Sequence, residues 1–456
     1  MKTPAKSSLV MLAVFASVHC AAATMVFPIA TNTSLVEVGG GAAFSGSNYL
    51  VGFGQNESNV CVQLVSSNGA LIGSPLVVGA SDNLGNPKVA FGKTNYLVAW
   101  DNDFNQPPMQ SLFCQLISMD GVTDGPPFAL DQLTPDGDEL ELALAFDGTN
   151  FLSVWSDDGT ETLYAQLVSP TGTLLGSAST VASGEEAESG ALAVGATNSL
   201  LVWQSKVSDS PETWSIYGAF ISRSGSVSSP FQISQTNSPA YNPTGVAFDG
   251  TNYLVVWNLN INSIWNVDAR FVSPNETLIG NEFNLVTEAV YPTVVFDGAN
   301  YLLSWTWGSN GNNLFCQFLN RSAAAIGPAF SVFPLGANNF VFGGVIYDGE
   351  GLAAETVLGT AGYNSSGNIV SGVIYGAVLP ASAAPPRLNA ASPPATGQFP
   401  LTLSGTPGIN YAIQASTNLS LADWTTIAIN SPTNGTFNFT DMSATNESRF
   451  YRAVRQ

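Results

Sequence analysis

The sequence of 456 residues contains a single histidine, His19, near the start of the chain. Lys2 and Lys6 precede an apolar run over residues 9–18, and small residues follow at 21–23, which is the pattern of a signal peptide covering residues 1–23. No histidine remains once that segment is removed. Histidine-dependent catalytic triads, histidine general bases and histidine-ligated zinc or copper sites are therefore excluded for the mature chain.

Cysteine is also scarce. Cys20 lies in the leader region, and Cys61, Cys114 and Cys316 are spread widely along the rest of the chain. Three such cysteines give neither a disulfide framework nor the spacing of a metal site. We do not expect a lipoprotein anchored through Cys20, because the residue before it is His19, where a small residue belongs.

Basic charge and long apolar runs are the other two absences. No second apolar run reaches the ~18 residues that a transmembrane helix needs, so we do not expect an integral membrane protein. Twelve Lys and Arg stand against 33 Asp and Glu, for a net charge of −21, or −23 without Lys2 and Lys6. Such a surface repels nucleic acid and anionic lipid, and neither is expected as a partner.

The chain contains a repeated sequence motif of the form Ala-Phe-Asp-Gly-Thr-Asn-Tyr-Leu-Val-Val-Trp. Six copies carry the asparagine of the motif, at Asn48, Asn95, Asn150, Asn198, Asn252 and Asn300. A seventh, degenerate copy begins at Ile346. The intervals between these asparagines are 47, 55, 48, 54 and 48 residues. A period near 50 residues is typical of a β-propeller, so the repeat predicts seven blades.

Each period contains four strand-sized pieces, which in the fifth copy are residues 245–248, 253–257, 267–273 and 282–286. The last copy has its third strand at residues 373–379 but no recognisable fourth strand. Residues 27–32 resemble the fourth strands of other copies, so we expect the N-terminal segment to complete the seventh blade. This closure would leave no open sheet edge in the ring.

The composition changes after the propeller array. An Ala- and Pro-rich linker over residues 381–394 precedes a segment at 395–456 in which alternating apolar residues favour half-buried strands. The predicted fold class is all-β: a seven-bladed β-propeller over residues 25–380 followed by a small β-sandwich domain. The linker and the second domain together hold four arginines and three acids, a charge of +1, which leaves six basic and 30 acidic residues, or −24, in the propeller.

The array resembles secreted bacterial β-propellers of the Phe-Asp-Gly-Thr-Asn-Tyr-Leu-Val-Val-Trp repeat type. The segment with Gly405-Thr-Pro-Gly-Ile-Asn-Tyr-Ala-Ile-Gln-Ala-Ser, Trp424-Thr-Thr and Arg449-Phe-Tyr-Arg resembles the C-terminal β-sandwich module of secreted bacterial proteins. The first resemblance implies a fold and no activity, and the second implies surface display or adhesion. Unlike some propellers, this array has no Asp-x-Asp-x-Asp-Gly calcium loop between its strands.

Residues that recur at the same position in several blades are expected to be structural. The repeated aspartates precede Gly in tight hairpins, where Asp accepts hydrogen bonds from its own backbone rather than forming a ring of metal ligands; they are Asp147, Asp249, Asp297 and Asp348. The repeated tryptophans should pack between blades; they are Trp100, Trp155, Trp203, Trp257 and Trp305. Cys114 and Cys316 occupy a third-strand position that other blades give to Ala or Gly, so we expect them to be buried packing residues.

Function should lie in what is not repeated. The turns from first to second strand and from third to fourth strand are uniform, and they lie on one face of the disc, the constant face. The connections from second to third strand and from blade to blade differ in length and content, and they lie on the opposite face, the variable face.

Three tryptophans fall on the variable face, namely Trp214, Trp265 and Trp307. Exposed rings beside amide side chains are a common way to grip sugars, so we expect these residues to form a carbohydrate-binding site. The alternative is that they cap the blade edges.

Acidic clusters also lie on the variable face: Asp136, Asp138, Glu139 and Glu141, then Asp157, Asp158 and Glu161. They form either a solvated acidic rim or the paired carboxylates of a glycosidase. Asp101, Asp103 and Asn105 resemble the start of a calcium loop, although Gln106 stands where Gly belongs and Leu112 where the closing acid belongs. Calcium is therefore the one candidate cofactor.

Two functions follow from these features. The first is an extracellular or periplasmic binding or scaffold protein that recognises a polysaccharide or a cell-envelope component through the variable face. The alternative is a polysaccharide hydrolase or lyase that uses carboxylates among Asp136, Asp138, Asp157 and Asp158.

Overall fold

The computed structural model describes residues 25–30, 37–56, 58–80, 87–102, 111–130, 139–157, 159–184, 187–209, 212–235, 245–307, 314–332, 345–347, 353–363, 369–379, 387–390, 397–404, 411–417, 424–430, 436–444 and 449–455. The chain forms two compact units, residues 22–381 and residues 382–456. The predicted signal peptide and Cys20 lie outside the described residues. None of the described residues belongs to an apolar helix long enough to cross a membrane.

The first unit consists of seven four-stranded antiparallel sheets, numbered here as blades 1 to 7. Blades 1 and 2 contain β2 (Glu37–Phe44), β3 (Asn48–Gln55), β4 (Asn59–Ser66), β5 (Leu71–Ala80), β6 (Lys88–Phe91), β7 (Asn95–Asn102), β8 (Ser111–Ser118) and β9 (Thr123–Ala129). Blades 3 and 4 contain β10 (Glu139–Phe146), β11 (Phe151–Asp157), β12 (Thr162–Val168), β13 (Leu174–Ser183), β14 (Ala187–Val194), β15 (Asn198–Asp209), β16 (Glu212–Ser222) and β17 (Phe231–Gln232).

Blades 5 and 6 contain β18 (Gly245–Phe248), β19 (Tyr253–Ile261), β20 (Ile264–Val272), β21 (Leu278–Thr287), β22 (Ala289–Phe296), β23 (Tyr301–Trp307), β24 (Leu314–Leu319) and β25 (Ala325–Ser331). Blade 7 contains β26 (Val345–Tyr347), β27 (Ala353–Tyr363) and β28 (Ile369–Leu379), with β1 (Met25–Ala30) as its fourth strand. First strands of successive blades contact one another around the ring, and β2 of blade 1 contacts β26 of blade 7. The protein is therefore an all-β chain with a seven-bladed propeller, as the repeat predicts.

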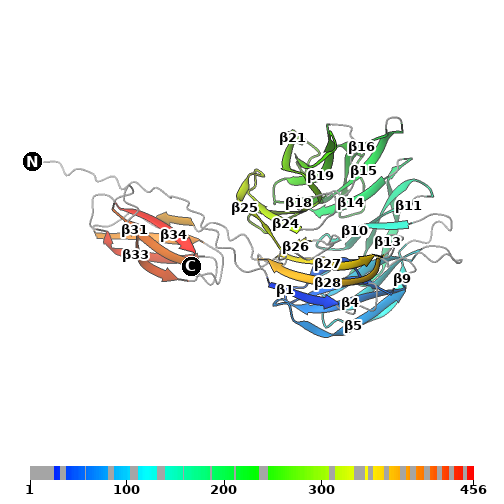
Figure 1. The fold of residues 1–456 in the computed structure, drawn as a ribbon, viewed down its shortest axis with the longest axis horizontal. Coiled ribbons are helices and arrows are strands. Elements are labelled where there is room, and N and C mark those ends of the chain that lie inside the picture. The colour runs from blue at the N-terminus through cyan, green and yellow to red at the C-terminus, as the bar shows by residue number, and fades with distance from the viewer. Residues whose placement is uncertain are drawn as a thin grey trace, which may run out of the picture. The chain divides into compact units, whose positions relative to one another are not determined.

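The ring closes through its N-terminal strand. β1 pairs antiparallel with β28, from Met25 opposite Val378 to Ala30 opposite Ile374. Figure 1 shows β1, in blue, beside β28 and β27, in orange and yellow. The expectation that the N-terminal segment supplies the missing fourth strand is confirmed.

The core lies between the blades. The repeated tryptophan of the second strand is buried in blades 2 to 6 and packs against apolar residues of the preceding blade in each case. Cys61, Cys114 and Cys316 are buried, and none of them forms a disulfide within the described part of the chain. Both predictions of a structural role are confirmed, because each of these side chains fills space where two blades approach.

The second unit contains two three-stranded sheets. One has the order β29 (Arg387–Ala390), β30 (Gly397–Ser404), β33 (Thr436–Ala444), and the other has the order β32 (Thr425–Asn430), β31 (Tyr411–Ser416), β34 (Phe450–Arg455). Both sheets contribute to one apolar core. In this core the ring of Phe399 from the first sheet stacks on the ring of Tyr451 from the second, with the ring centroids 5.1 Å apart. Two sheets on a shared core are the expected arrangement of a small β-sandwich.

Candidate functional site

The hairpins of the constant face are closed by the repeated aspartates. Oδ1 of Asp249 accepts hydrogen bonds from the backbone N–H groups of Thr251 (2.8 Å) and Asn252 (2.7 Å). Asp147 and Asp297 make the same pair of bonds in their own turns. These three carboxylates accept hydrogen bonds from the backbone of their own turns, as expected of Asp at this position. The fourth repeated aspartate, Asp348, lies outside the described residues.

The constant face also carries bonds between blades. The hydroxyl groups of Tyr96 and Tyr253 donate to the carbonyl oxygens of Asn48 (2.8 Å) and Asn198 (2.9 Å) in the preceding blades. Burial raises the pKa of Tyr96 to about 12, so its hydroxyl remains a donor at ordinary pH. The Asn95 amide donates to the carbonyl of Pro170 in the following blade (2.8 Å). The constant face is thus a structural surface.

The variable face is built out in blades 4 and 5 by long hairpins. β15 and β16 run to Asp209 and from Glu212, and β19 and β20 run to Ile261 and from Ile264. Sequence analysis ends the second strand of blade 5 at residue 257 and starts the third at 267, and this prediction was wrong. The missed residues alternate Asn with apolar residues, and Asn262 and Ser263 form the turn at positive φ (54° and 67°).

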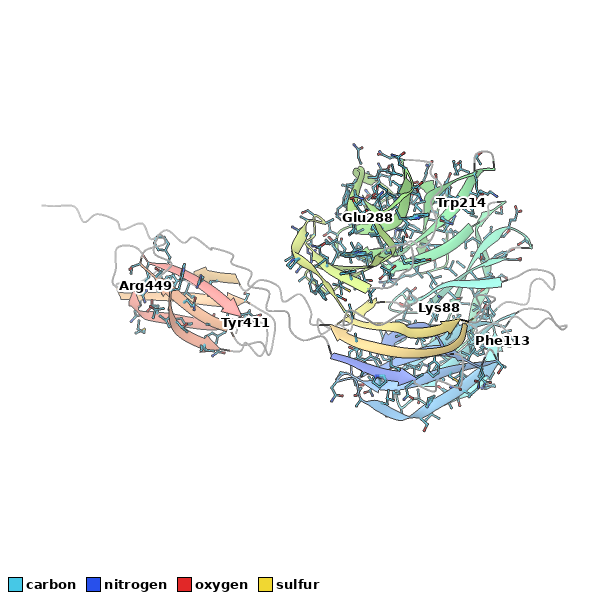
Figure 2. All side chains as sticks on the ribbon, in the orientation of Figure 1. Lys88, Phe113, Trp214, Glu288, Tyr411 and Arg449 are labelled. Atoms are coloured by element: carbon cyan, nitrogen blue, oxygen red, sulfur yellow. The ribbon has the colours of Figure 1, made fainter. Side chains whose placement is uncertain are left out.

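Trp214, which was predicted to bind a ligand, is buried in the structure. It lies on β16 opposite Lys206, only 4% of its surface is exposed, and its Nε1 donates to Oε1 of Glu212 at 2.9 Å. The Lys206 ammonium lies 5.9 Å from the ring centroid. A ring enclosed in this way has no open face for stacking on a sugar, so the expectation of an exposed Trp214 was wrong. Figure 2 labels Trp214 on blade 4.

The other two predicted tryptophans occupy neighbouring blades. Trp265 is half-buried on β20 opposite Asn260, at the position that Trp214 holds in blade 4. Trp307 ends β23 opposite Ala289, and its side chain lies outside the described residues. Their predicted role in ligand binding stays a prediction.

Sequence analysis missed an exposed tyrosine beside this hairpin. Tyr291 on β22 is 43% exposed and has φ of 56°, a left-handed conformation that is an outlier for a bulky residue. Buried Asn258 of β19 fixes it: Oδ1 accepts from the Tyr291 N–H at 2.9 Å, while Nδ2 donates to the carbonyls of Asn266 (3.3 Å) and Ala289 (3.0 Å). No local sequence signal marks Tyr291, because its conformation is imposed by a residue of another blade.

The tip of the blade-5 hairpin exposes two apolar side chains, which lie on the strand face that is turned toward blade 4 and away from Tyr291. Ile261 and Ile264, which flank the turn, are 48% and 44% exposed. β22 contacts both β19 and β20, so Tyr291 and the hairpin belong to one region of the variable face. We call this region, made of Tyr291, Trp265 and Asn260, the blade-5 patch, since alternation along the strands turns Trp265 and Asn260 toward blade 6.

Of the two acidic clusters predicted on the variable face, the structure describes the side chains of Asp157 and Glu161. Asp157 is 1% exposed, and its Oδ1 accepts from the Thr160 N–H at 3.1 Å, so it caps a turn and does not belong to a solvated rim. Asp136, Asp138 and Asp158 lie outside the described residues, as do the side chains of Glu139 and Glu141. Glu161 is exposed, at φ of 48°.

Of the three calcium candidates, the structure describes only Asp101, so the calcium site stays a prediction. Asp101 is half-buried near the end of β7, opposite Leu112, and Asp103 and Asn105 lie outside the described residues. Within the described part of the chain, no three acidic, histidine or cysteine side chains are grouped as metal ligands.

Asp268 is a buried carboxylate that sequence analysis did not single out. It lies opposite Trp257 in blade 5, where blades 2, 3, 4 and 6 place an aromatic ring that stacks on the core tryptophan. It is 7% exposed, and Oδ1 accepts from Nδ2 of Asn284 at 2.8 Å. Burial raises the pKa of Asp268, the Asn284 bond opposes this, and the Glu282 charge adds to it.

No protein-family model matches the chain, and no curated protein sequence matches it either. Among solved structures, it is similar to a protein of unknown function from Dyadobacter fermentans, with 10% identity, a TM-score of 0.50, and coverage of 78% of this chain and 98% of that one. An α-L-arabinanase of Penicillium chrysogenum shows 9% identity, a TM-score of 0.43 and coverage of 67% and 99%. The GH93 α-L-arabinofuranosidase of Fusarium graminearum shows 11% identity, a TM-score of 0.46 and coverage of 79% and 98%. The first of these likenesses supports the fold alone.

Proposed function

We propose that this chain is a secreted binding protein whose propeller recognises a carbohydrate at the blade-5 patch of the variable face. The observation that carries the proposal is the presentation of Tyr291. A non-glycine residue in the left-handed region costs roughly 1–3 kcal/mol, and such residues gather at binding and catalytic sites. Here the buried side chain of Asn258 holds that conformation by accepting a hydrogen bond from the Tyr291 N–H, and the tyrosine ring stays exposed.

The chemistry of the patch suits a sugar. An aromatic ring offers an apolar face to the C–H side of a pyranose or furanose, and polar groups beside it bind the hydroxyl groups. Asn260 is the cross-strand partner of Trp265, so its amide lies on the same face of the hairpin as the indole ring. Trp265 adds a second half-buried ring on the adjacent strand.

A glycan array with the full chain tests this proposal. Tyr291→Ala and Trp265→Ala should each weaken the strongest glycan signal, and the Kd should rise about threefold to tenfold on loss of one stacked ring. Val122→Ala is the control, because Val122 is an exposed apolar residue in a turn of the constant face.

Two outcomes contradict the proposal. Equal glycan binding by the wild type and both patch variants would remove the site from this surface. Release of reducing ends from polysaccharides by the wild type would favour the hydrolase or lyase reading. Export is checked separately by fractionating cells that produce the chain with its leader.

A further inference from the structure

The second unit carries a polar row on the side of its second sheet that faces away from the shared core. Tyr411, Ile413 and Ala415 of the middle strand β31 point into that core. Successive side chains of a strand alternate between faces, so Gln414 lies on the opposite side. Arg452 of β34 and Thr426 of β32 are its cross-strand partners there.

These side chains form one connected arrangement. Nε of Arg452 donates to Oε1 of Gln414 at 2.7 Å, and Nε2 of Gln414 donates to Oγ1 of Thr426 at 3.1 Å. The guanidinium of Arg452 lies over the indole ring of Trp424, with its central carbon 4.4 Å from the ring centroid. Arg452 is thus fixed by a hydrogen bond at one edge and by stacking on one face.

No described residue bonds to the outer edge of this guanidinium. Within the described part of the chain, Arg452 makes no hydrogen bond or ion pair through its two terminal nitrogens. The other arginines whose side chains are described behave differently: Arg449 pairs with Asp441, and the guanidinium groups of Arg223, Arg270 and Arg321 donate to backbone carbonyls. Burial also lowers the pKa of Arg452, and no carboxylate of the described residues offsets this desolvation.

We propose that this surface binds the carboxylate of a uronic acid residue in an acidic polysaccharide, with the terminal nitrogens of Arg452 as the bidentate donor. A guanidinium presents two parallel N–H groups that match the two oxygens of a carboxylate. Arg452 is already oriented by Gln414 and Trp424, so little side-chain entropy remains to be lost on binding. The Thr426 hydroxyl, two strands away in the same row, is exposed for a neighbouring sugar hydroxyl.

The position favours a sugar over an acidic peptide. Extended peptides are commonly captured by adding a strand to an open sheet edge, whereas Gln414 belongs to the middle strand, which is paired on both sides. Recognition here must come from side chains above the sheet. A single cation beside an aromatic ring and a hydroxyl suits a polymer with one carboxylate per sugar residue.

The test measures binding of an oligogalacturonate to the full chain by calorimetry at physiological salt. Arg452→Gln should raise the Kd about tenfold or more through loss of a charge-assisted bidentate pair, and Arg452→Lys should recover only part of the affinity. The fully methyl-esterified oligomer has the same sugar backbone without the charge, and it should bind no better to the wild type than to Arg452→Gln. Arg223→Gln is the matched control, because it removes one exposed arginine from the propeller.

Several results would overturn the proposal. These are no binding of galacturonate, alginate or glucuronate oligomers, equal affinity in Arg452→Gln, equal binding of the methyl ester, and a short oligoglutamate that binds as tightly as the sugar acid. A lowered melting temperature of Arg452→Gln with unchanged affinity would make the Arg452 and Trp424 stack purely structural. This site is independent of the blade-5 patch, so Tyr291→Ala should leave uronate binding unchanged.

Discussion

Asp268 shows how one substitution within a repeat changes the physics of a blade. Its position belongs to an aromatic ring in four other blades, and in blade 5 a carboxylate takes that place beside Trp257. The stacked pair is lost and a charge is buried with one hydrogen bond from Asn284. Arg270, two residues further on, donates to the carbonyls of Gly280 and Ile233. Blade 5 therefore buries an ionisable group at its contact with blade 4, where four other blades place an aromatic ring.

We expect Asp268→Asn to stabilise the protein at neutral pH and to have no such effect in acid. Because the folded-state pKa of Asp268 is raised, the folded chain holds its proton to higher pH than the unfolded chain does. Stability therefore falls as pH rises from the ordinary value near 3.8 through the raised value. Asparagine keeps the acceptor for Asn284 and removes this loss.

Melting temperatures between pH 3 and pH 8 test this expectation. Glu276→Gln is the control, since Glu276 is an exposed carboxylate in a turn of the same blade. Parallel melting curves for the wild type and Asp268→Asn across the whole range would show that burial of Asp268 does not govern the pH dependence.

At the scale of the element, a glutamine side chain of the third strand donates hydrogen bonds to the backbone of the fourth strand, at a bulge that contains glycine. Nε2 of Gln166 donates to the carbonyls of Leu167 (2.8 Å) and Leu175 (3.1 Å), beside Gly176 at φ of 73°. Gln63, Gln115 and Gln317 make related bonds in blades 1, 2 and 6. Blade 4 has Ala219 at this position, and its fourth strand is only the two residues of β17. The glutamine therefore helps to hold the fourth strand in place.

We expect Gln166→Leu to lower the free energy of unfolding by about 1–3 kcal/mol, because it leaves buried carbonyl groups without a donor. Gln317→Leu should cost less, since the bond from Gln317 to Gly327 lies in an exposed setting. Urea denaturation of the two variants measures the difference. An equal, small effect of both would mean that the bulge holds without its glutamine.

At the scale of the whole molecule, closure of the ring joins two segments that are more than 340 residues apart in sequence. Ile29 of β1 is buried with Tyr49, Phe53 and Ile374, so it links the seventh blade to the first. Loop-closure entropy opposes such a pairing, and the apolar contacts of β1 must offset it. Closure of the ring therefore depends on the apolar contacts of β1.

We expect Ile29→Asp to open the ring, because an unpaired carboxylate buried at this seam costs several kcal/mol. Ile29→Val should cost only about 1 kcal/mol, since it removes a single methylene. Limited proteolysis and the melting temperature report the opening. A melting temperature of Ile29→Asp equal to that of Ile29→Val would show that β1 does not close the ring.

The sequence by itself determined the number of blades, the closing strand and the structural role of the repeated residues. Asp249 in its turn, Trp257 in the core and β1 beside β28 follow from local hydrogen bonding, from a period near 50 residues and from a missing fourth strand. These features recur in each blade or concern the backbone alone, so a pattern along the chain is enough to predict them. The absence of histidine after residue 19 likewise needed no structure.

Only the tertiary structure decided which side chains are available for function. Trp214 and Trp265 share one register position, yet Trp214 is enclosed by Glu212 and Lys206 while Trp265 is more accessible. The backbone of Tyr291 is fixed by Asn258 of another blade, and Arg452 is oriented by a strand 38 residues away. Burial and orientation are set by neighbours that are distant in sequence, and a local pattern of residues carries no information about those neighbours.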